Sequence, residues 1–120
     1  DFLVVDFHGE ITSEKMAIGH FFDGKATLVV GTHTHVPTND VRVLTNGTAY
    51  QTDAGMCGDY DSVIGMNKEN SLNRFLKKES KKHFPAEGDA TLCGLIVECN
   101  ISNGLASKAE PFIYGGNLIK

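Results

Sequence analysis

The start of the chain contains two short apolar runs separated by a helix-like segment, and this order constrains the fold more than any other feature. Residues 2–7 are apolar except for Asp6, and residues 27–30 form a second run that ends at Gly31. Short runs rich in Val and Phe are typical of buried strands. A strand, a helix and a strand in succession form a βαβ unit, so we expect the two strands to be parallel.

Helix and turn residues predict the remaining elements. Thr12 and Ser13 favour a helix start, and Asp23-Gly24 favours its end. Asn-Gly pairs at residues 46–47 and 103–104 are typical of tight hairpin turns. The expected elements are a partly buried helix with Met16, Ala17, Ile18, Phe21 and Phe22, a hairpin of residues 41–44 and 48–52, a helix over residues 68–78 with Leu72, Phe75 and Leu76 on one face, and a terminal hairpin of residues 91–101 and 105–114.

Composition and charge exclude several classes of protein. Apolar residues make up 41% of the chain and charged residues 22%, which is ordinary for a globular domain and argues against disorder. The net charge of −4 gives no basic surface for DNA, and no run reaches the roughly 18 apolar residues of a membrane-spanning helix. An odd number of cysteines gives no even disulfide framework, so we interpret Cys57, Cys93 and Cys99 as reduced thiols of a cytoplasmic protein.

The chain begins without methionine and inside a predicted strand. A buried strand that starts at residue 2 implies partner strands that cover it. A natural terminus usually has a polar lead-in before its first strand, and this chain has none. We therefore expect residues 1–120 to be the C-terminal part of a single α/β domain whose N-terminal part is absent.

Three histidines follow the two predicted strands closely. His8 comes after the first run, and His33 and His35 come after the second. The carboxyl ends of parallel strands open into one crevice. In extended backbone, residues two apart point to the same side at a spacing of roughly 6.5 Å, so His33 and His35 can converge on one ion or on two neighbouring ions. Neutral imidazole is a common ligand of Zn, Fe and Mn, and the three histidines therefore predict a metal site.

Two acidic residues flank the first of these histidines. Asp6 alternates with His8, so we expect it on the same strand face, where it can orient an imidazole as an outer partner of a metal. Direct ligation by Asp6 or Glu10 is a further interpretation. The simpler ones are a buried, hydrogen-bonded Asp6 and a capping or solvated Glu10.

Three blocks of the sequence stand out: Asp6-Phe7-His8-Gly9-Glu10-Ile11-Thr12-Ser13-Glu14-Lys15, Gly31-Thr32-His33-Thr34-His35-Val36 and Thr52-Asp53-Ala54-Gly55-Met56-Cys57-Gly58. They resemble the signatures of YmdB-like metallophosphoesterases, which belong to the calcineurin-like phosphoesterase superfamily. The resemblance covers residues 1–76, and residues 60–65 also fit it. Three residues depart from it: Gly9 stands where Ala is usual, and Pro37 and Cys57 stand where Gln and Thr are frequent. A thiol near a metal can bind the ion or be oxidised.

The resemblance implies a calcineurin-like βαβ sandwich of mixed sheets flanked by helices, with two divalent metal ions in its cleft. It implies that His8 and His33 bind one ion and His35 the other, with Fe or Mn as the expected metals and Zn as the alternative. The family completes the site with an upstream Asp, a bridging Glu, an Asn and a further His. Those upstream motifs are absent from residues 1–120, so we expect this chain alone to be inactive.

The implied reaction is hydrolysis of phosphodiester bonds, with cyclic nucleotides such as 2′,3′-cAMP as the expected substrates. Two metal ions would activate a water molecule as hydroxide near neutral pH and would neutralise charge on the phosphate. Backbone N–H groups of residues 53–58 are candidates for a phosphate cradle, and a glycine-rich turn that binds no ligand is the alternative. Asp6, Thr34, Asp53 and Gly55 are the residues expected to bind phosphate or to support the ligands. The family commonly self-associates, so a homo-oligomer is a further expectation.

Two other functions stay open from the sequence. The first is a mononuclear zinc hydrolase that uses His8, His33 and His35 as a three-histidine site. The second is a non-catalytic, metal-bound partner in regulation or RNA processing. A count of one metal ion per complete chain would distinguish the zinc hydrolase from the two-metal phosphodiesterase. A ligand variant that keeps its biological effect while losing hydrolysis would identify the second.

Overall fold

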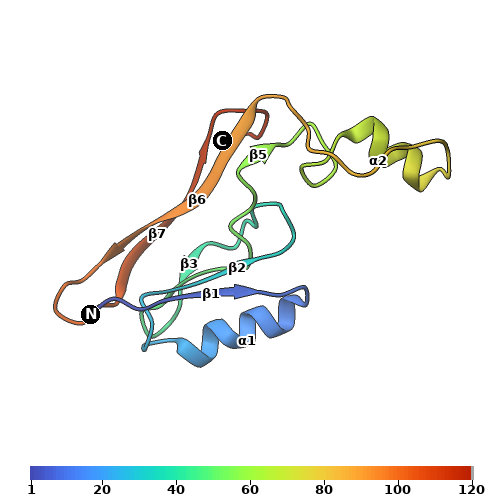
Figure 1. The fold of residues 1–120 in the computed structure, drawn as a ribbon. Helices are drawn as coiled ribbons and strands as arrows, with labels where there is room; N and C mark the ends of the chain where they lie inside the picture. The colour runs from blue at the N-terminus through green and yellow to red at the C-terminus, as the bar shows by residue number, and fades with distance from the viewer. Residues whose placement is uncertain (120) are drawn as a thin grey trace. The chain divides into compact units, whose positions relative to one another are not determined.

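The computed structural model describes residues 1–119, which form two compact units. The first unit comprises Asp1–Gly55 and Cys93–Phe112, and the second comprises Met56–Leu92 and the residues from Ile113 onward (Figure 1). The structure is α/β, with two helices and two sheets, one of which mixes parallel and antiparallel pairs. This α/β class is the one that the sequence predicts.

A four-stranded sheet forms the centre of the first unit. Its first two strands are parallel, which confirms the βαβ prediction, and the third strand in sheet order is parallel to them as well. The fourth strand pairs antiparallel at the far edge. In sheet order the strands are β1 (Val4–His8), β2 (Leu28–Thr32), β4 (Ala49–Gln51) and β3 (Arg42–Val43).

Strand β1 is less buried than the sequence predicts. It begins at Val4 rather than at residue 2, and its side chains alternate between exposed and half-buried. Phe2 and Val4 are each 59% exposed. The reason is the position of β1 at an edge of the sheet, where only its Val5 and Phe7 face is partly covered by the described residues. Among the described residues the strand is therefore only partly buried, and its full burial by partner strands from the rest of the whole protein stays a prediction.

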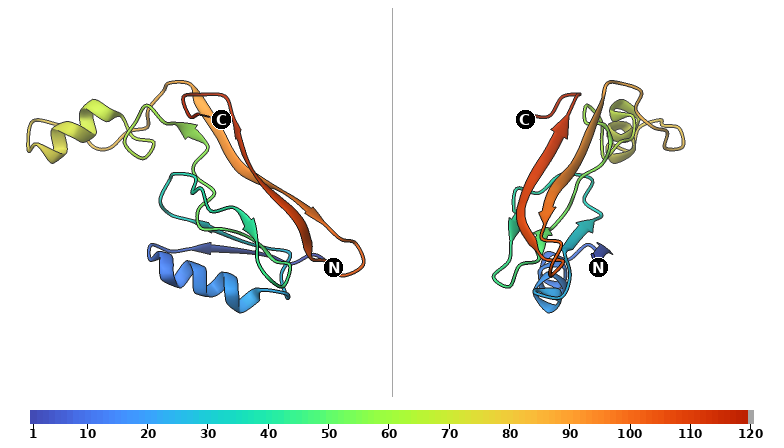
Figure 2. Two further views of the ribbon diagram at one scale, coloured as in Figure 1. Left: turned by 180° about the vertical axis from the view of Figure 1, so that it is seen from behind. Right: turned by 90° about the vertical axis from the view of Figure 1, so that its left-hand side faces the viewer.

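Helix α1 (Thr12–Phe22) has the expected limits but presents a different face to the sheet. The helix runs alongside β1 and β2 in Figure 1 and in the left-hand view of Figure 2. Met16, Ala17 and Phe21 are exposed, contrary to the prediction. The covered side of the helix consists of Lys15, Ile18, Gly19 and Phe22, at the i, i+3, i+4, i+7 spacing of one helix face.

The core of the first unit forms around Tyr50, which is only 1% exposed. Gly19 allows α1 to approach this ring, because a Cβ atom at that position would lie 2.5 Å from Tyr50 Cδ2. The apolar cluster around the ring consists of Ala26, Val29, Leu44 and Tyr50, with Val5, Ile18 and Phe22 packed against it. This cluster fixes α1 against the sheet.

Substitution of Gly31 is expected to destabilise the protein. A Cβ atom at Gly31 would overlap the Thr52 carbonyl oxygen and press on Lys15 Cε, so the backbone must shift. We expect Gly31→Ala to lower the free energy of unfolding by about 1–3 kcal/mol, measured by urea denaturation of the whole natural protein. Gly94→Ala is the matched control, because a Cβ atom at Gly94 meets nothing within 4 Å. Equal stability of the two variants would contradict the prediction.

Both predicted hairpins are present. Strands β3 and β4 pair antiparallel, and Gly47 in their turn has a φ of 99°, a value that glycine adopts readily. Strands β6 (Ala90–Cys99) and β7 (Ala106–Tyr114) are hydrogen-bonded neighbours, and Gly104 in their turn has a φ of 72°. Within the first unit, the Thr27 hydroxyl donates to the Gly104 carbonyl over 2.6 Å.

The second unit contains β5 (Gly58–Asp59), which pairs antiparallel with the start of β6, and helix α2 (Lys68–Phe75). The helix ends at Phe75 rather than at residue 78, and its predicted apolar face is exposed: Leu72 by 56%, Phe75 by 79% and Leu76 by 54%. Its buried residues are polar. Asn70 exchanges hydrogen bonds with the Lys81 backbone, so this side of the helix faces the following loop.

Neither α1 nor α2, the helices of residues 1–119, is long and apolar enough to cross a membrane.

Candidate metal centre

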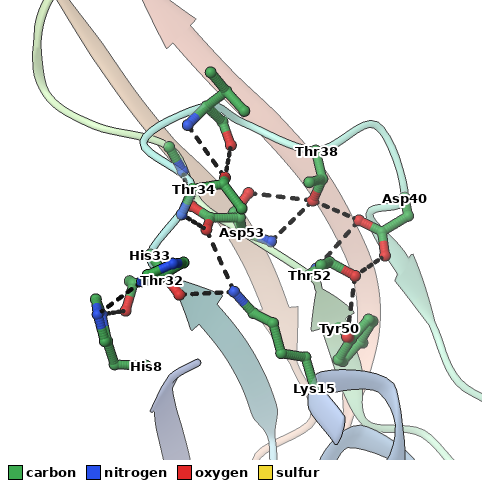
Figure 3. Close-up of polar contacts among 12 residues, drawn as sticks. His8, Lys15, Thr32, His33, Thr34, Thr38, Asp40, Tyr50, Thr52 and Asp53 are labelled. Atoms are coloured by element: carbon green, nitrogen blue, oxygen red, sulfur yellow. Dashed lines mark hydrogen bonds and ion pairs between the residues drawn. The ribbon is translucent and has the colours of Figure 1, made fainter. Parts of the chain in front are cut away.

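His8 and His33 lie side by side at the carboxyl ends of the two parallel strands. His8 is the last residue of β1 and is in register with Thr32 at the end of β2, so His33 follows immediately beside it. His8 Nε2 lies 3.3 Å from His33 Nδ1, and the ring centroids are 5.1 Å apart with an interplanar angle of 79° (Figure 3). Both side chains are exposed. The structure thus brings together two of the three histidines that the sequence singles out.

Thr32 contacts the other nitrogen of the His8 ring. The Thr32 hydroxyl lies 2.9 Å from His8 Nδ1 and forms a hydrogen bond with it. Metal-binding histidines usually engage an outer partner through the nitrogen that does not face the metal, and this partner fixes the ring orientation. Thr32 was not among the predicted site residues. The sequence indicates only that Thr32, like His8, lies at the end of a predicted strand, and the register that pairs the two residues is seen in the structure.

The backbone around the second and third histidines is strained. His33 has a φ of 129° and His35 a φ of 66°, both in the range that side-chain-bearing residues rarely adopt. Such conformations persist only where surrounding contacts enforce them, and they gather at functional sites. His35 is half-buried. Among residues 1–119, no group of three or more His, Cys, Asp or Glu side chains is placed to hold one ion, so His35 does not join His8 and His33 in such a group.

Lys15 and Asp53 form a buried ion pair directly beneath this loop. Each side chain is 1% exposed, and Lys15 Nζ lies 3.4 Å from Asp53 Oδ2. Lys15 Nζ also donates to the Thr32 carbonyl over 2.7 Å, and Asp53 Oδ2 accepts from the Thr34 backbone N–H over 2.7 Å (Figure 3). Nothing in the sequence indicates this role for Lys15, because a helical lysine is ordinarily solvated.

Hydrogen bonds determine the ionisation of Asp53. Burial raises the pKa of its carboxyl, but the backbone N–H groups of Thr34 and Gly55 and the nearby Lys15 outweigh burial and hold the pKa below its ordinary value. Asp53 is therefore a carboxylate at neutral pH. Its Oδ1 accepts from the Gly55 N–H over 2.9 Å.

The backbone N–H groups that follow Asp53 already have acceptors within the chain. Ala54 donates to the Gly31 carbonyl over 2.9 Å, Gly55 donates to Asp53, and Met56 donates to the Tyr60 hydroxyl over 2.9 Å. Each N–H supplies one hydrogen, so these three groups stabilise the loop and are not open donors for a phosphate. Thr34 is also engaged, because its hydroxyl donates to the Val36 carbonyl over 3.1 Å.

Asp6 lies on the exposed face of β1, the same face as His8. The alternation predicted from the sequence is therefore present. Among the described residues Asp6 is exposed rather than buried, because β1 is an edge strand and this face is not covered by them. Cys57 is exposed and belongs to the second unit.

A second carboxylate network lies beside the first. Asp40 Oδ1 accepts from the Thr38 hydroxyl over 2.7 Å, and Asp40 Oδ2 accepts from the Thr52 hydroxyl over 2.5 Å (Figure 3). Burial raises the pKa of Asp40, but these hydrogen bonds, with the Arg42 guanidinium 3.3 Å away, lower it below its ordinary value. The Tyr50 hydroxyl joins the network through Thr52 over 3.0 Å.

The Asp40 network predicts a loss of stability in acid. A carboxyl whose pKa is lower in the folded state than in the unfolded state stabilises the fold above the unfolded pKa, and this contribution falls away as the pH drops below about 5. We expect the melting temperature of the wild-type protein to fall between about pH 5 and pH 3 more steeply than that of Asp40→Asn. Parallel melting curves for the two proteins across this range would contradict the assignment.

The donor set of the histidine pair fits a divalent metal ion. Two nitrogens 3.3 Å apart can both bind one ion at bond lengths of about 2.1 Å, because their separation is less than twice that length. With Nδ1 of His8 engaged by Thr32, its Nε2 is the nitrogen directed at His33. The arrangement can therefore hold one ion through two neutral imidazoles, with further ligands required from elsewhere.

Comparison with known proteins identifies the family. A model of the YmdB-like protein family matches residues 1–112. The 2′,3′-cyclic-nucleotide 2′-phosphodiesterase of Bacillus subtilis (strain 168) is 46% identical over 112 residues, which cover 93% of this chain and 42% of that protein. The chain thus spans about two-fifths of the length of the curated relatives that it matches.

Two solved structures have the same fold over nearly all of this chain. A hypothetical protein from Thermus thermophilus superimposes with a TM-score of 0.85 at 40% identity, covering 97% of this chain and 45% of that one. A protein described as a novel phosphatase, from Mycoplasma pneumoniae, superimposes with a TM-score of 0.84 at 41% identity, covering 92% of this chain and 40% of that one. With the family match over residues 1–112, these findings show that the chain belongs to the YmdB-like protein family.

Proposed function

We propose that the whole protein containing this chain is a dinuclear metal-dependent phosphodiesterase of the calcineurin-like type, with residues 1–120 as the C-terminal part of its domain. His8 and His33 hold one divalent ion, and His35 belongs to the second. The observation that supports this most directly is the 3.3 Å approach of His8 Nε2 to His33 Nδ1 at the carboxyl ends of two parallel strands. The substrates are small phosphodiesters, and the name of the Bacillus subtilis relative favours 2′,3′-cyclic nucleotides.

Divalent ions bound at the histidines would provide a nucleophile at neutral pH and would neutralise charge on the phosphate. Fe and Mn are the metals we expect. The residues of this chain supply the ligands and their orientation. His8 Nε2 and His33 Nδ1 face one another, and the Thr32 hydroxyl holds the His8 ring in that orientation. The carboxylate and amide ligands that complete two sites are proposed to come from the rest of the whole protein.

A mononuclear three-histidine zinc site is the less favoured alternative. Such a site needs His8, His33 and His35 around one ion. The part of the chain that the structure describes contains no cluster of three candidate ligands, whereas His8 and His33 already form a pair. Placing His35 on a second ion agrees with its absence from the His8–His33 pair.

Metal analysis and turnover of the whole natural protein test the proposal. The protein is stripped with a chelator, refilled with Mn²⁺ or Fe²⁺, and assayed with bis(p-nitrophenyl) phosphate and with 2′,3′-cAMP. We expect two ions per chain and hydrolysis that depends on them, and we expect residues 1–120 alone to be inactive. One ion per chain with full activity would favour the mononuclear alternative. Hydrolysis that survives complete metal removal would overturn the proposal.

The Thr32 hydroxyl provides a more specific prediction. Thr32→Val keeps the shape of the side chain but removes the hydrogen bond to His8 Nδ1. Loss of an outer partner typically costs about 10–100-fold in metal affinity, so we expect a weakening of Mn²⁺ binding of that size. Thr32→Ser keeps the hydroxyl and should retain most of the affinity. Equal weakening in both variants would mean that packing, rather than the hydroxyl, is what matters.

A further inference from the structure

The Lys15–Asp53 pair is unusual because both charges are buried and both are directed at one short piece of backbone. Lysine and aspartate are almost never fully buried unless they are paired, and here each is 1% exposed. Beyond their mutual contact, Lys15 Nζ donates to the Thr32 carbonyl, while Asp53 accepts from the Thr34 and Gly55 N–H groups. Two of these contacts lie on the peptide groups immediately before and after His33.

His33 needs such support because its backbone conformation is energetically unfavourable. Its φ of 129° lies where a side-chain-bearing residue is strained, and the φ of His35 is also positive. Without contacts on both sides, the loop would relax toward ordinary conformations and the His33 ring would turn away from His8. Lys15 holds the preceding carbonyl and Asp53 holds the following N–H, so the pair fixes the segment from both ends.

Close packing shows that the pair is built into this position. Gly31 lies against Lys15 Cε and the Thr52 carbonyl, leaving no space for a side chain. The Ala54 N–H donates to the Gly31 carbonyl over 2.9 Å, so the residue that follows Asp53 is anchored to β2. Lys15 is itself held by α1, which packs against the core of the first unit. The pair thereby connects the helix, the end of β2 and the residues after β4.

We propose that Lys15 and Asp53 are positioning residues for the metal centre, holding His33 so that its Nδ1 faces His8 Nε2. This inference depends on the proposed function, since it assigns the pair to the same metal site. The consequence is specific. Neutralising either charge lowers the metal affinity of folded protein, whereas a merely structural ion pair would lower the melting temperature and leave the affinity of the folded protein unchanged.

Metal titration of the whole natural protein tests the proposal. Variants Lys15→Met and Asp53→Asn are compared with the wild type for the Mn²⁺ dissociation constant, measured by competition with a chelating dye well below the melting temperature. We expect an affinity about 10–100-fold weaker in both, the range found for outer partners of metal ligands. We expect the kcat of both variants to be closer to the wild-type value at saturating Mn²⁺ than at limiting Mn²⁺. Lys25→Met is the matched control, because Lys25 is exposed. We expect this variant to bind Mn²⁺ as tightly as the wild type does.

Asp53→Asn is the deciding variant, because it keeps the side-chain shape and an acceptor oxygen even if Lys15→Met fails to fold. Wild-type Mn²⁺ affinity in folded Asp53→Asn would overturn the proposal while leaving the proposed function intact. The proposed function itself fails if the wild type and His33→Ala bind Mn²⁺ equally, or if neither binds it, and the positioning role then fails with it. These results are distinguishable in one series of titrations.

Discussion

Replacing His33 with alanine is expected to abolish most of the affinity of the whole protein for the divalent ion that His8 and His33 share, together with its metal-dependent phosphodiester hydrolysis. His33 Nδ1 faces His8 Nε2 at 3.3 Å, so the substitution leaves His8 as the single imidazole of the pair. Loss of an outer partner already costs about 10–100-fold, and loss of a ligand should exceed that range. The Mn²⁺ dissociation constant and the rate of bis(p-nitrophenyl) phosphate hydrolysis measure the effect.

Two control variants separate metal binding from folding. His20→Ala removes an exposed histidine on α1 and should change neither quantity. His33→Gly should lose metal as fully as His33→Ala, but its metal-free form should melt at a higher temperature, because glycine accepts the φ of 129° without strain. Full Mn²⁺ affinity in His33→Ala would remove His33 from the site and overturn the proposed ligand set.

Much of the site could be predicted from the sequence because strand ends mark where side chains gather. His8 and His33 lie at the carboxyl ends of consecutive parallel strands, whereas the register that places His8 beside Thr32 is seen only in the structure. Lys15 could not be found in this way. Its burial depends on the rotation of α1, and the apolar pattern of the helix suggested a face that included Met16 and Phe21, both of which are exposed.

The same reasoning explains which parts of the fold were predictable. Asn-Gly turns depend on local backbone chemistry, and both hairpins appear where these pairs predict them. Strand β2 instead continues through Gly31 to Thr32, past the end that the sequence predicts. Burial depends on what covers an element, which a local pattern does not contain. Val4 on edge strand β1 and Phe75 on α2 are therefore exposed, although their segments are apolar. Likewise, no shift in composition marks Met56, where the second unit begins.

Replacing Tyr50 with alanine is expected to cause the largest loss of stability in the chain. Tyr50 is the largest of the fully buried side chains, and its ring packs against Gly19 and lies 5.0 Å from the Arg42 guanidinium carbon. Removing a buried aromatic ring typically costs about 3–5 kcal/mol, against a total stability of about 5–15 kcal/mol for a natural domain. Urea denaturation of the metal-free whole protein measures the change.

The matched variant Tyr50→Phe keeps the ring and removes only the hydroxyl that meets Thr52 over 3.0 Å, so it should cost about 0.5–1.5 kcal/mol. The comparison also tests how the core supports the site. Tyr50 holds α1 against the sheet through Gly19, and α1 supplies Lys15, so the folded fraction of Tyr50→Ala should bind Mn²⁺ more weakly than Tyr50→Phe does. Equal Mn²⁺ affinity in the two variants would show that the Lys15–Asp53 pair holds the His33 loop independently of the packing of α1.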